Sequence, residues 1–144
     1  TLGRHAAAFA RFKEHVRKNF DLPMLTRLFP AGTVLRRVVI EQEGALSFGR
    51  QMGSYPILVG IPLRVACGEV IDAVVVDWGM RSVTALPCPV DINHLPVAAL
   101  RWIPGVGKAR SAAIAAPRPF ASVAQFREAA GATPIDGVLA FKPL

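Results

Sequence analysis

A short stretch with two glycines, PGVG at residues 104–107, has the residue types of a phosphate-binding turn. Glycine has no Cβ, so the backbone can turn tightly and approach another surface closely. If a helix starts directly after the turn, its first amides lack intrahelical acceptors and favour an anion together with the helix dipole. Basic residues in that first turn cost about 0.3–1 kcal/mol each, and a bound anion would offset this cost. The candidate phosphate-binding residues are Gly105, Val106, Gly107, Lys108 and Arg110.

The other reactive residues do not predict catalysis by this chain alone. The three histidines are far apart in the sequence. Asp72 and Asp77 lie five positions apart on one predicted strand, and therefore on opposite faces. No serine or cysteine stands in a nucleophile motif, and Cys67 and Cys88 lack the close spacing of metal ligands. We therefore expect no catalytic residue and no metal site in this chain.

The charge of the chain is compatible with a polyanionic partner, but basic surfaces are common and many bind no particular partner. The formal net charge is +7. Residues 1–32 contain six basic and two acidic residues, residues 91–144 contain six and three, and residues 33–90 contain five of each. Basic segments attract nucleic acid or anionic surfaces through long-range fields. The two ends, more than the middle, are therefore expected to meet such a partner.

The composition predicts a soluble, cytoplasmic protein with no membrane partner. Hydrophobic residues make up 52% of the chain, which is enough for a core. No apolar run approaches the roughly 20 residues that cross a bilayer, and charged residues interrupt the first 20 positions, unlike a signal peptide. Scarce Asn and Gln beside plentiful Arg and Pro favour a thermophilic source. The start at Thr1 leads us to expect a fragment of a longer protein.

Residues 1–32 form the first of three segments and are predicted to be helical. Apolar side chains at Phe9, Phe12, Val16 and Phe20 follow the spacing of one helix face. The helix is predicted to end near Pro23, because proline disfavours helical backbone at the residue before it; a second short helix would follow. The basic faces either contact phosphate or are solvated while the apolar face packs on a partner or an absent domain.

The middle segment, residues 33–90, is predicted to be a small antiparallel β-barrel. Five β-rich runs recur at spacings of about ten residues, with Gly or Pro between them. The runs are TVLRRVVIEQEG, ALSFGRQM, YPILVGIP, GEVIDAVVVDWG and RSVTAL. No helical pattern is long enough for parallel crossovers.

The third segment, residues 91–144, is predicted to hold three helices. The first runs from about Pro96 to Ile103 with Asp91 or Asn93 as its cap. The second runs from about Lys108 to Ala115, and the third is VAQFREAA, capped by Ser122 and ended by Gly131. The fold class is therefore α+β: an N-terminal helix, a barrel and a C-terminal helical bundle.

The stretch DINHLPVAALRWIPGVGKARSAAI resembles a helix-hairpin-helix motif, in its lead-in, its spaced leucines, its hairpin and the Ala/Ile pattern behind it. This resemblance implies binding of DNA or RNA phosphates without sequence specificity, through hairpin amides and nearby cations. Such units also serve architecture or protein contacts. They often work in pairs, and AAGATP at residues 129–134, where a second hairpin would lie, departs from the pattern.

The middle segment resembles a TRAM-type module, a small OB-like barrel at the ends of RNA-modifying enzymes. Gly49-Arg50, Tyr55 and Gly68 carry the resemblance. It implies a nucleic-acid face with Arg50, Tyr55 and Arg81, where Tyr55 offers a stacking surface. The alternative is that Tyr55 and Phe48 fill the barrel while Arg50 pairs with Glu41 or Glu43, and the neutral charge of this segment favours it slightly.

The order of the segments resembles the C-terminal region of archaeal radical-SAM iron–sulfur proteins that end in a helix-hairpin-helix. That family binds a 4Fe–4S cluster and S-adenosylmethionine in an N-terminal domain, and no three-cysteine motif is present in this sequence. The resemblance implies a nucleic-acid-binding accessory region of a larger enzyme, in contact with its own N-terminal catalytic domain and without a cofactor of its own. The alternative is a structural or protein-interaction module that docks on that domain or self-associates.

Overall fold

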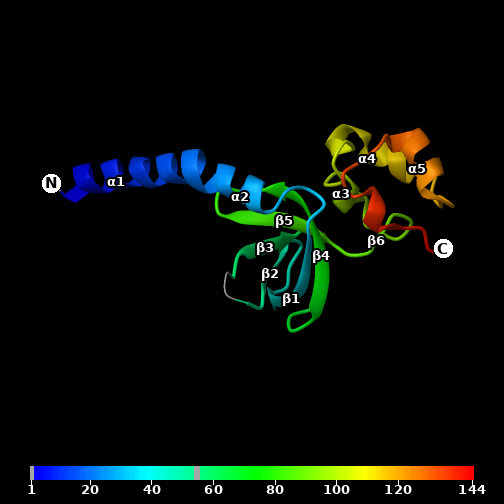
Figure 1. Ribbon diagram of the computed structural model, residues 1–144, viewed down its shortest axis with the longest axis horizontal. Helices are drawn as coiled ribbons and strands as arrows, with labels where there is room; N and C mark the ends of the chain where they lie inside the picture. Colours follow the sequence, from blue (N-terminus) through cyan, green and yellow to red (C-terminus); the bar gives the residue numbers. More distant parts are fainter. Residues whose placement is uncertain (1, 54–55) are drawn as a thin grey trace.

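The computed structural model describes residues 2–53 and 56–144, apart from the side chains of Leu2 and Arg4. A helical arm (residues 2–28) leads into a barrel (residues 34–87) and then into a C-terminal unit (residues 90–144) (Figure 1). The elements are α1 (Leu2–Val16), a π-helical turn (Arg17–Asp21), α2 (Leu22–Leu28), β1 (Val34–Gln42), β2 (Ser47–Gln51), β3 (Leu58–Ile61), β4 (Val70–Trp78), β5 (Ser82–Pro87), β6 (Val90–Asp91), α3 (Val97–Leu100), α4 (Gly107–Ala115), α5 (Val123–Ala130), a 3-10 turn (Asp136–Val138) and β7 (Leu139–Ala140).

The five predicted strands are all present and close into a barrel in the order β1-β2-β3-β5-β4. The predicted all-antiparallel pairing is wrong at one place, since β3 and β5 run parallel. The connection from β3 through β4 brings β5 back beside β3, and a local strand pattern carries no information on such distant pairing. Gly49 marks a close approach in this barrel: a Cβ there would lie 2.5 Å from the carbonyl oxygen of Val39 in β1.

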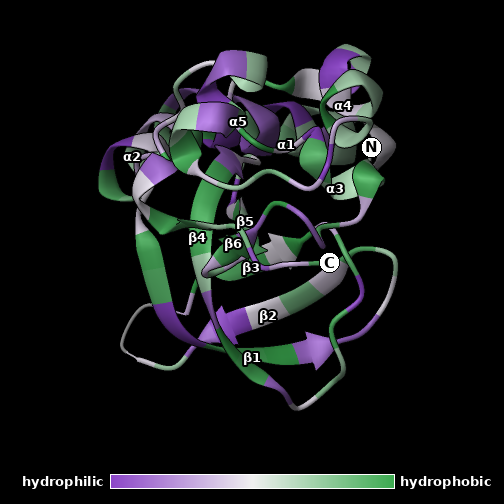
Figure 2. Cartoon of the chain, turned by 90° about the vertical axis from the view of Figure 1, so that its right-hand side faces the viewer, coloured by the Kyte–Doolittle hydropathy of each residue, from purple (hydrophilic) through white to green (hydrophobic). Residues whose placement is uncertain are grey.

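The strand β4 is buried on both faces, which explains its unbroken run of valines. Ala73 and Val75 point into the barrel, where they join its core. Val74 and Val76 point outward and join a second cluster with Ile92 and other residues of the C-terminal unit. Viewed end-on, β4 is a long hydrophobic ribbon below the C-terminal helices (Figure 2). The outer face of β4 therefore packs against the C-terminal unit, while its inner face closes the barrel core.

The helical arm continues where the sequence predicts a break. Leu22 donates its backbone N–H to the carbonyl oxygen of Arg17, five residues earlier, so one π-helical turn precedes Pro23. Proline lacks an N–H and is tolerated in the first turn of the following helix. The predicted end near Pro23 is therefore wrong, although the second helix exists.

The arm is anchored to the barrel at its C-terminal end, around α2. Leu25 is buried in the barrel core, and the indole N–H of Trp78 donates to the carbonyl oxygen of Phe29 at 2.7 Å. The helix α1 extends away from the barrel (Figure 1). Phe9, Phe12 and Phe20, the predicted apolar face, are each 62% exposed.

The C-terminal unit differs from its prediction at its first helix. That helix, α3, is confined to Val97–Leu100 and has no side-chain cap, where the sequence predicts a helix from Pro96 to Ile103. Asn93 instead ties segments together: its amide donates to the carbonyl oxygens of Phe120 and Lys142, and its oxygen accepts from the N–H of Phe120. The third helix is confirmed, with Ser122 accepting from the N–H of Gln125 and Gly131 beyond its end.

Candidate nucleic-acid interface

The turn between α3 and α4 is built on two glycines in the left-handed region. Gly105 has φ +94° and Gly107 has φ +70°, values that L side chains rarely adopt. Between them Val106 is 4% exposed and packs into the core of the C-terminal unit. The glycine hairpin (residues 104–107) is thus pinned by its central side chain while both glycines are exposed.

The predicted phosphate-binding residues divide into those that face solvent and those that hold the hairpin. The N–H of Val106 donates to the carbonyl oxygen of Ile103 at 3.0 Å, so this amide is already used. The guanidinium of Arg110 donates to the carbonyl oxygens of Gly105 and Ala129 at 2.9 and 3.0 Å, which ties the hairpin to the end of α5. Lys108 is exposed in the first turn of α4, a helix with no side-chain cap.

Two hollows meet at the hairpin and share three side chains. The first, about 330 Å³, lies between the hairpin and the end of β4, with Val76 and Asp77 on the barrel side. The second, about 540 Å³, lies between α3–α4 and the barrel loops around Leu46 and Pro62. Both hollows are lined by Arg101, Trp102 and Lys108.

The sequence predictions did not include Arg101 and Trp102, although both directly precede the hairpin. The guanidinium carbon of Arg101 lies 4.9 Å from the centre of the Trp102 ring, within the range of cation–π attraction. Trp102 is half-buried against the core, and Arg101 is exposed. A basic residue followed by an aromatic one at the rim of a predicted binding turn is the signal that would have identified them.

The hairpin cations differ from most of the barrel arginines, four of which lie beside a carboxylate. Within residues 2–53 and 56–144, neither Arg101 nor Lys108 forms an ion pair with a carboxylate. Asp77 lines the first hollow, and its side chain accepts from the N–H of Trp78. The interface therefore combines two uncompensated cations with one carboxylate nearby.

The barrel residues predicted to bind nucleic acid are engaged by acids. Arg50 pairs with Glu41 at 2.7 Å, which is the alternative pairing that the sequence left open. Arg81 lies 3.6 Å from Asp21 of the arm. Both arginines line a hollow of about 340 Å³ together with Leu58 and α2, so the fold does bring them together. Tyr55 lies outside the described residues.

Asp72, another acid of the barrel, binds the backbone at a β-bulge in β1. The register shifts between Leu35 and Val38, where Arg37 has φ +56°. Asp72 accepts from the N–H of Arg37 at 3.1 Å and from the guanidinium of Arg36 at 2.9 Å. These bonds, the backbone bond first, hold the pKa of Asp72 below its ordinary value.

The cysteines do not fit the ligand set of an iron–sulfur cluster. The Cys67 thiol donates to the carbonyl oxygen of Glu41, and Cys88 is half-buried beyond β5, where burial raises the pKa of its thiol. No three His, Cys, Asp or Glu side chains of the described chain are grouped so that they could hold a metal ion. None of the described helices is long and apolar enough to span a membrane.

The sequence of this chain is similar to segments of longer archaeal proteins. An uncharacterized protein of Archaeoglobus fulgidus is 39% identical over 104 residues, which cover 72% of this chain and 20% of that protein. An uncharacterized protein of Methanocaldococcus jannaschii is 51% identical over 79 residues, which cover 53% of this chain and 14% of that protein. No protein-family model and no solved structure matches. The chain thus spans a fifth or less of the length of these two archaeal relatives.

Proposed function

We propose that this chain is a nucleic-acid-binding region that holds the phosphate backbone of DNA or RNA at the glycine hairpin. In this proposal α3, the hairpin and α4 act as a helix-hairpin-helix, and the chain is an accessory region of a larger radical-SAM enzyme. The catalytic chemistry, with its iron–sulfur cluster and S-adenosylmethionine, belongs to a domain outside the chain. The length of the archaeal relatives leaves room in them for such a domain.

The observation that carries the proposal is the pair of uncompensated cations at a rigid, exposed turn. Arg101 and Lys108 flank the hairpin without a carboxylate partner among the described residues. Lys108 stands in the first turn of a nine-residue helix, where a cation opposes the helix dipole. A phosphate group would relieve both unfavourable features, because it accepts from helix N-terminal amides and from lysine.

The C-terminal framework supports a phosphate grip rather than sequence-specific recognition. The helices α3 and α4 pack against one another, and Val106 and Arg110 fix the hairpin between them. The hairpin therefore presents backbone amides and cations from a rigid base. Backbone contacts of this kind position a nucleic acid but carry no sequence information.

The barrel supports a second, weaker contact in the same proposal. Its five-strand order and single parallel pair suit an OB-like barrel of the TRAM type, in which the face of the second and third strands binds oligonucleotides. Arg50 of β2, Leu58 of β3 and Arg81 of the β4–β5 turn line one hollow on that face. Since both arginines are paired with acids, we assign the main electrostatic contribution to the hairpin.

Fluorescence anisotropy with a labelled mixed-sequence duplex of DNA, and one of RNA, tests the proposal. Lys108→Glu is expected to weaken binding about tenfold or more at low salt, equally for different sequences. Lys142→Glu makes the same charge change at an exposed lysine that lines neither hollow, and it should change the affinity much less. Equal affinities of a folded Lys108→Glu variant and the wild type would contradict the proposal.

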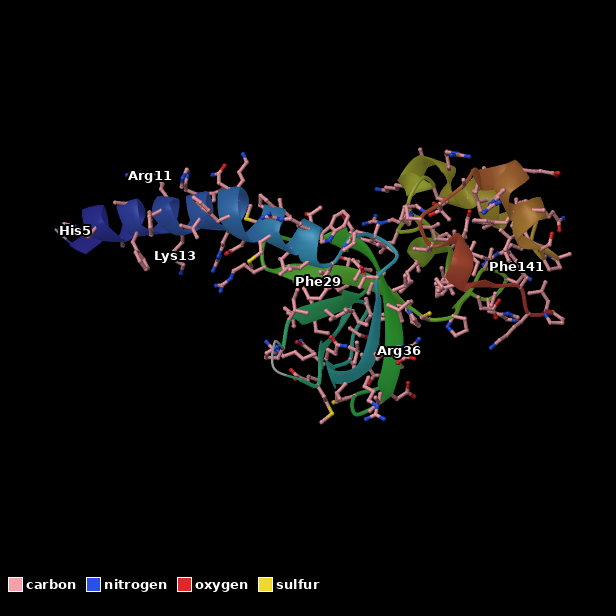
Figure 3. The ribbon with its side chains drawn as sticks, viewed as in Figure 1. His5, Arg11, Lys13, Phe29, Arg36 and Phe141 are labelled. Atoms are coloured by element: carbon pink, nitrogen blue, oxygen red, sulfur yellow. The ribbon has the colours of Figure 1, made fainter. Side chains whose placement is uncertain are left out.

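The second candidate function is a protein-interaction module, and the exposed face of α1 favours it. Phe9 and Phe12 of α1 are each 62% exposed. The same helix carries His5, Arg11 and Lys13 along its length (Figure 3). In this alternative α1 docks on the catalytic domain or on a second copy, and nucleic acid does not bind. If α1 docks on a second copy, sedimentation should show a dimer for the wild type and a monomer for Phe9→Ser/Phe12→Ser. In this alternative the anisotropy titration should show no salt-dependent binding of nucleic acid.

A further inference from the structure

The larger of the two hollows at the hairpin has the composition of a nucleobase site. Its floor is apolar, with Leu46 and Pro62 from the barrel loops and Val97 from α3. Leu46 and Val97 are 45% and 43% exposed, so this floor is open to solvent. A volume of about 540 Å³ lies within the usual range of small-ligand sites, about 300–1,000 Å³.

The rim of this hollow is cationic and aromatic. Arg101 and Lys108 stand at the edge, and no carboxylate is among the residues that line it. Arg101 lies over the Trp102 ring at 4.9 Å, and both side chains line the hollow. Both groups suit a base, since bases stack on aromatic rings and on guanidinium planes. The apolar residues and the Arg101–Trp102 pair suit a base, and the neighbouring Lys108 suits the phosphate attached to it.

The position of the hollow relative to the hairpin sets which nucleic acid fits. Arg101, Trp102 and Lys108 line this hollow and also the hollow at the hairpin. A strand whose phosphate lies at the hairpin therefore has the base site beside it. A base paired within a duplex cannot enter an apolar hollow, whereas an unpaired base can.

We infer that the groove between α3–α4 and the barrel loops binds an unpaired nucleotide of a single-stranded segment, with the base on the Arg101–Trp102 pair and its phosphate at Lys108. This inference rests on the proposed function and narrows it to single strands or to junctions of duplex and single strand. The hairpin contributes affinity for any backbone, and the groove adds a preference for unpaired bases.

The test uses short oligo(dT) and oligo(U) as single-stranded probes and a mixed-sequence duplex as the comparison. The chain has two tryptophans, so Trp78→Phe leaves Trp102 as the reporter. Addition of oligo(dT) to this variant should quench or shift Trp102 fluorescence. The duplex, whose bases are stacked on each other, should leave it nearly unchanged.

Two substitutions on opposite walls separate stacking from folding. Trp102→Leu should weaken binding of oligo(dT) about tenfold, as expected for loss of one stacked base, and change duplex binding less than about twofold. Leu46→Asn, on the barrel side and away from the core of the C-terminal unit, removes apolar surface without adding charge and should have the same selective effect. Circular dichroism and thermal melting establish that each variant is folded.

The possible outcomes discriminate between the two proposals. Binding of neither probe by the wild type would overturn the proposed function and, with it, this inference. Duplex binding without oligonucleotide binding would overturn the inference alone. The same would follow if both variants bound oligo(dT) as tightly as the wild type, or if they lost duplex and single-strand binding equally.

Discussion

The barrel and the C-terminal unit carry their arginines in different ways. In the barrel, four arginines lie beside a carboxylate, and they are Arg36, Arg50, Arg64 and Arg81. In the C-terminal unit, Arg110 and Arg118 donate to backbone carbonyl groups and Arg127 pairs with Asp136. Arg101 and Lys108 are without a carboxylate partner among the described residues. Other cations, such as Arg37 of β1 and Lys13 of α1, also form no ion pair among the described residues. What distinguishes Arg101 and Lys108 is their place beside the exposed glycine turn, where both line the same two hollows.

The largest effect is expected from removing the hydrogen bonds that Asn93 makes within the C-terminal unit. Asn93 is 4% exposed and joins three segments. Asn93→Ala would leave the partner N–H and carbonyl groups unsatisfied and should lower the free energy of unfolding by about 3 kcal/mol or more. Chemical denaturation followed by circular dichroism measures this.

The matched control for that experiment is Asn19→Ala, the same change at an exposed asparagine of the arm. It should alter the free energy of unfolding by about 0.5 kcal/mol or less. If the two variants were equally stable, the polar ties around Asn93 would not stabilise the C-terminal unit.

The next effect concerns the backbone of the hairpin. Gly107 has φ +70° with open space around its Cα, so a methyl group there meets no atom and only the conformation is strained. Gly107→Ala should lower the free energy of unfolding by about 1–2 kcal/mol, measured by thermal melting. Gly137→Ala also faces open space but outside the left-handed region, and a comparable loss there would show that the strain argument is incorrect.

A third prediction concerns the one carboxylate at the hairpin hollow. Asp77 lines this hollow on the barrel side and would repel a phosphate bound at Lys108. Asp77→Asn should therefore raise duplex affinity about threefold at low salt, with the gain disappearing at high salt. Asp72→Asn, the same change on the same strand outside both hollows, should leave anisotropy titrations unchanged. A gain at Asp72 alone would shift the phosphate site to the barrel.

The smallest effect is a pH dependence in the barrel. The bonds from Arg37 and Arg36 lower the pKa of Asp72 in the folded state. Its stabilisation is therefore present above the unfolded-state pKa and is lost as the pH falls through the folded-state pKa. Asp72→Asn should reduce the melting temperature slightly at neutral pH, and the difference from wild type should vanish in acid. A difference that persisted in acid would assign it to a cause other than this charge.

The strands and turns of the barrel could be predicted from the sequence because each is a local pattern. Alternation and Gly or Pro punctuation mark β1 to β5, and Ser122 with Gly131 marks α5. The parallel pairing of β3 with β5 was missed, since it depends on which distant strands meet. The continuation of the helix through Pro23 was missed because it depends on a π-helical turn. That turn ends at Asp21, so Pro23 stands in the first turn of α2, where a missing N–H is tolerated.

The candidate site was predictable only in its backbone. The two glycines predicted to allow a tight turn form one, and both have a positive φ in the structure. Which cations already have partners within the protein depended on tertiary contacts. The guanidinium of Arg110, for example, donates to carbonyl oxygens five and nineteen residues away. Trp102 is positioned by packing on a core cluster that includes Val74 and Val76 of β4, a contact distant in the sequence.

The most direct test of the central claim compares the salt dependence of duplex binding in two double variants. Arg101→Gln/Lys108→Gln removes both hairpin cations, and Arg50→Gln/Arg81→Gln removes two cations of the barrel face. The slope of log affinity against log salt concentration should fall by about two for the hairpin variant and by clearly less than one for the barrel variant. An equal or greater reduction in the barrel variant would contradict the assignment of the phosphate backbone to the hairpin.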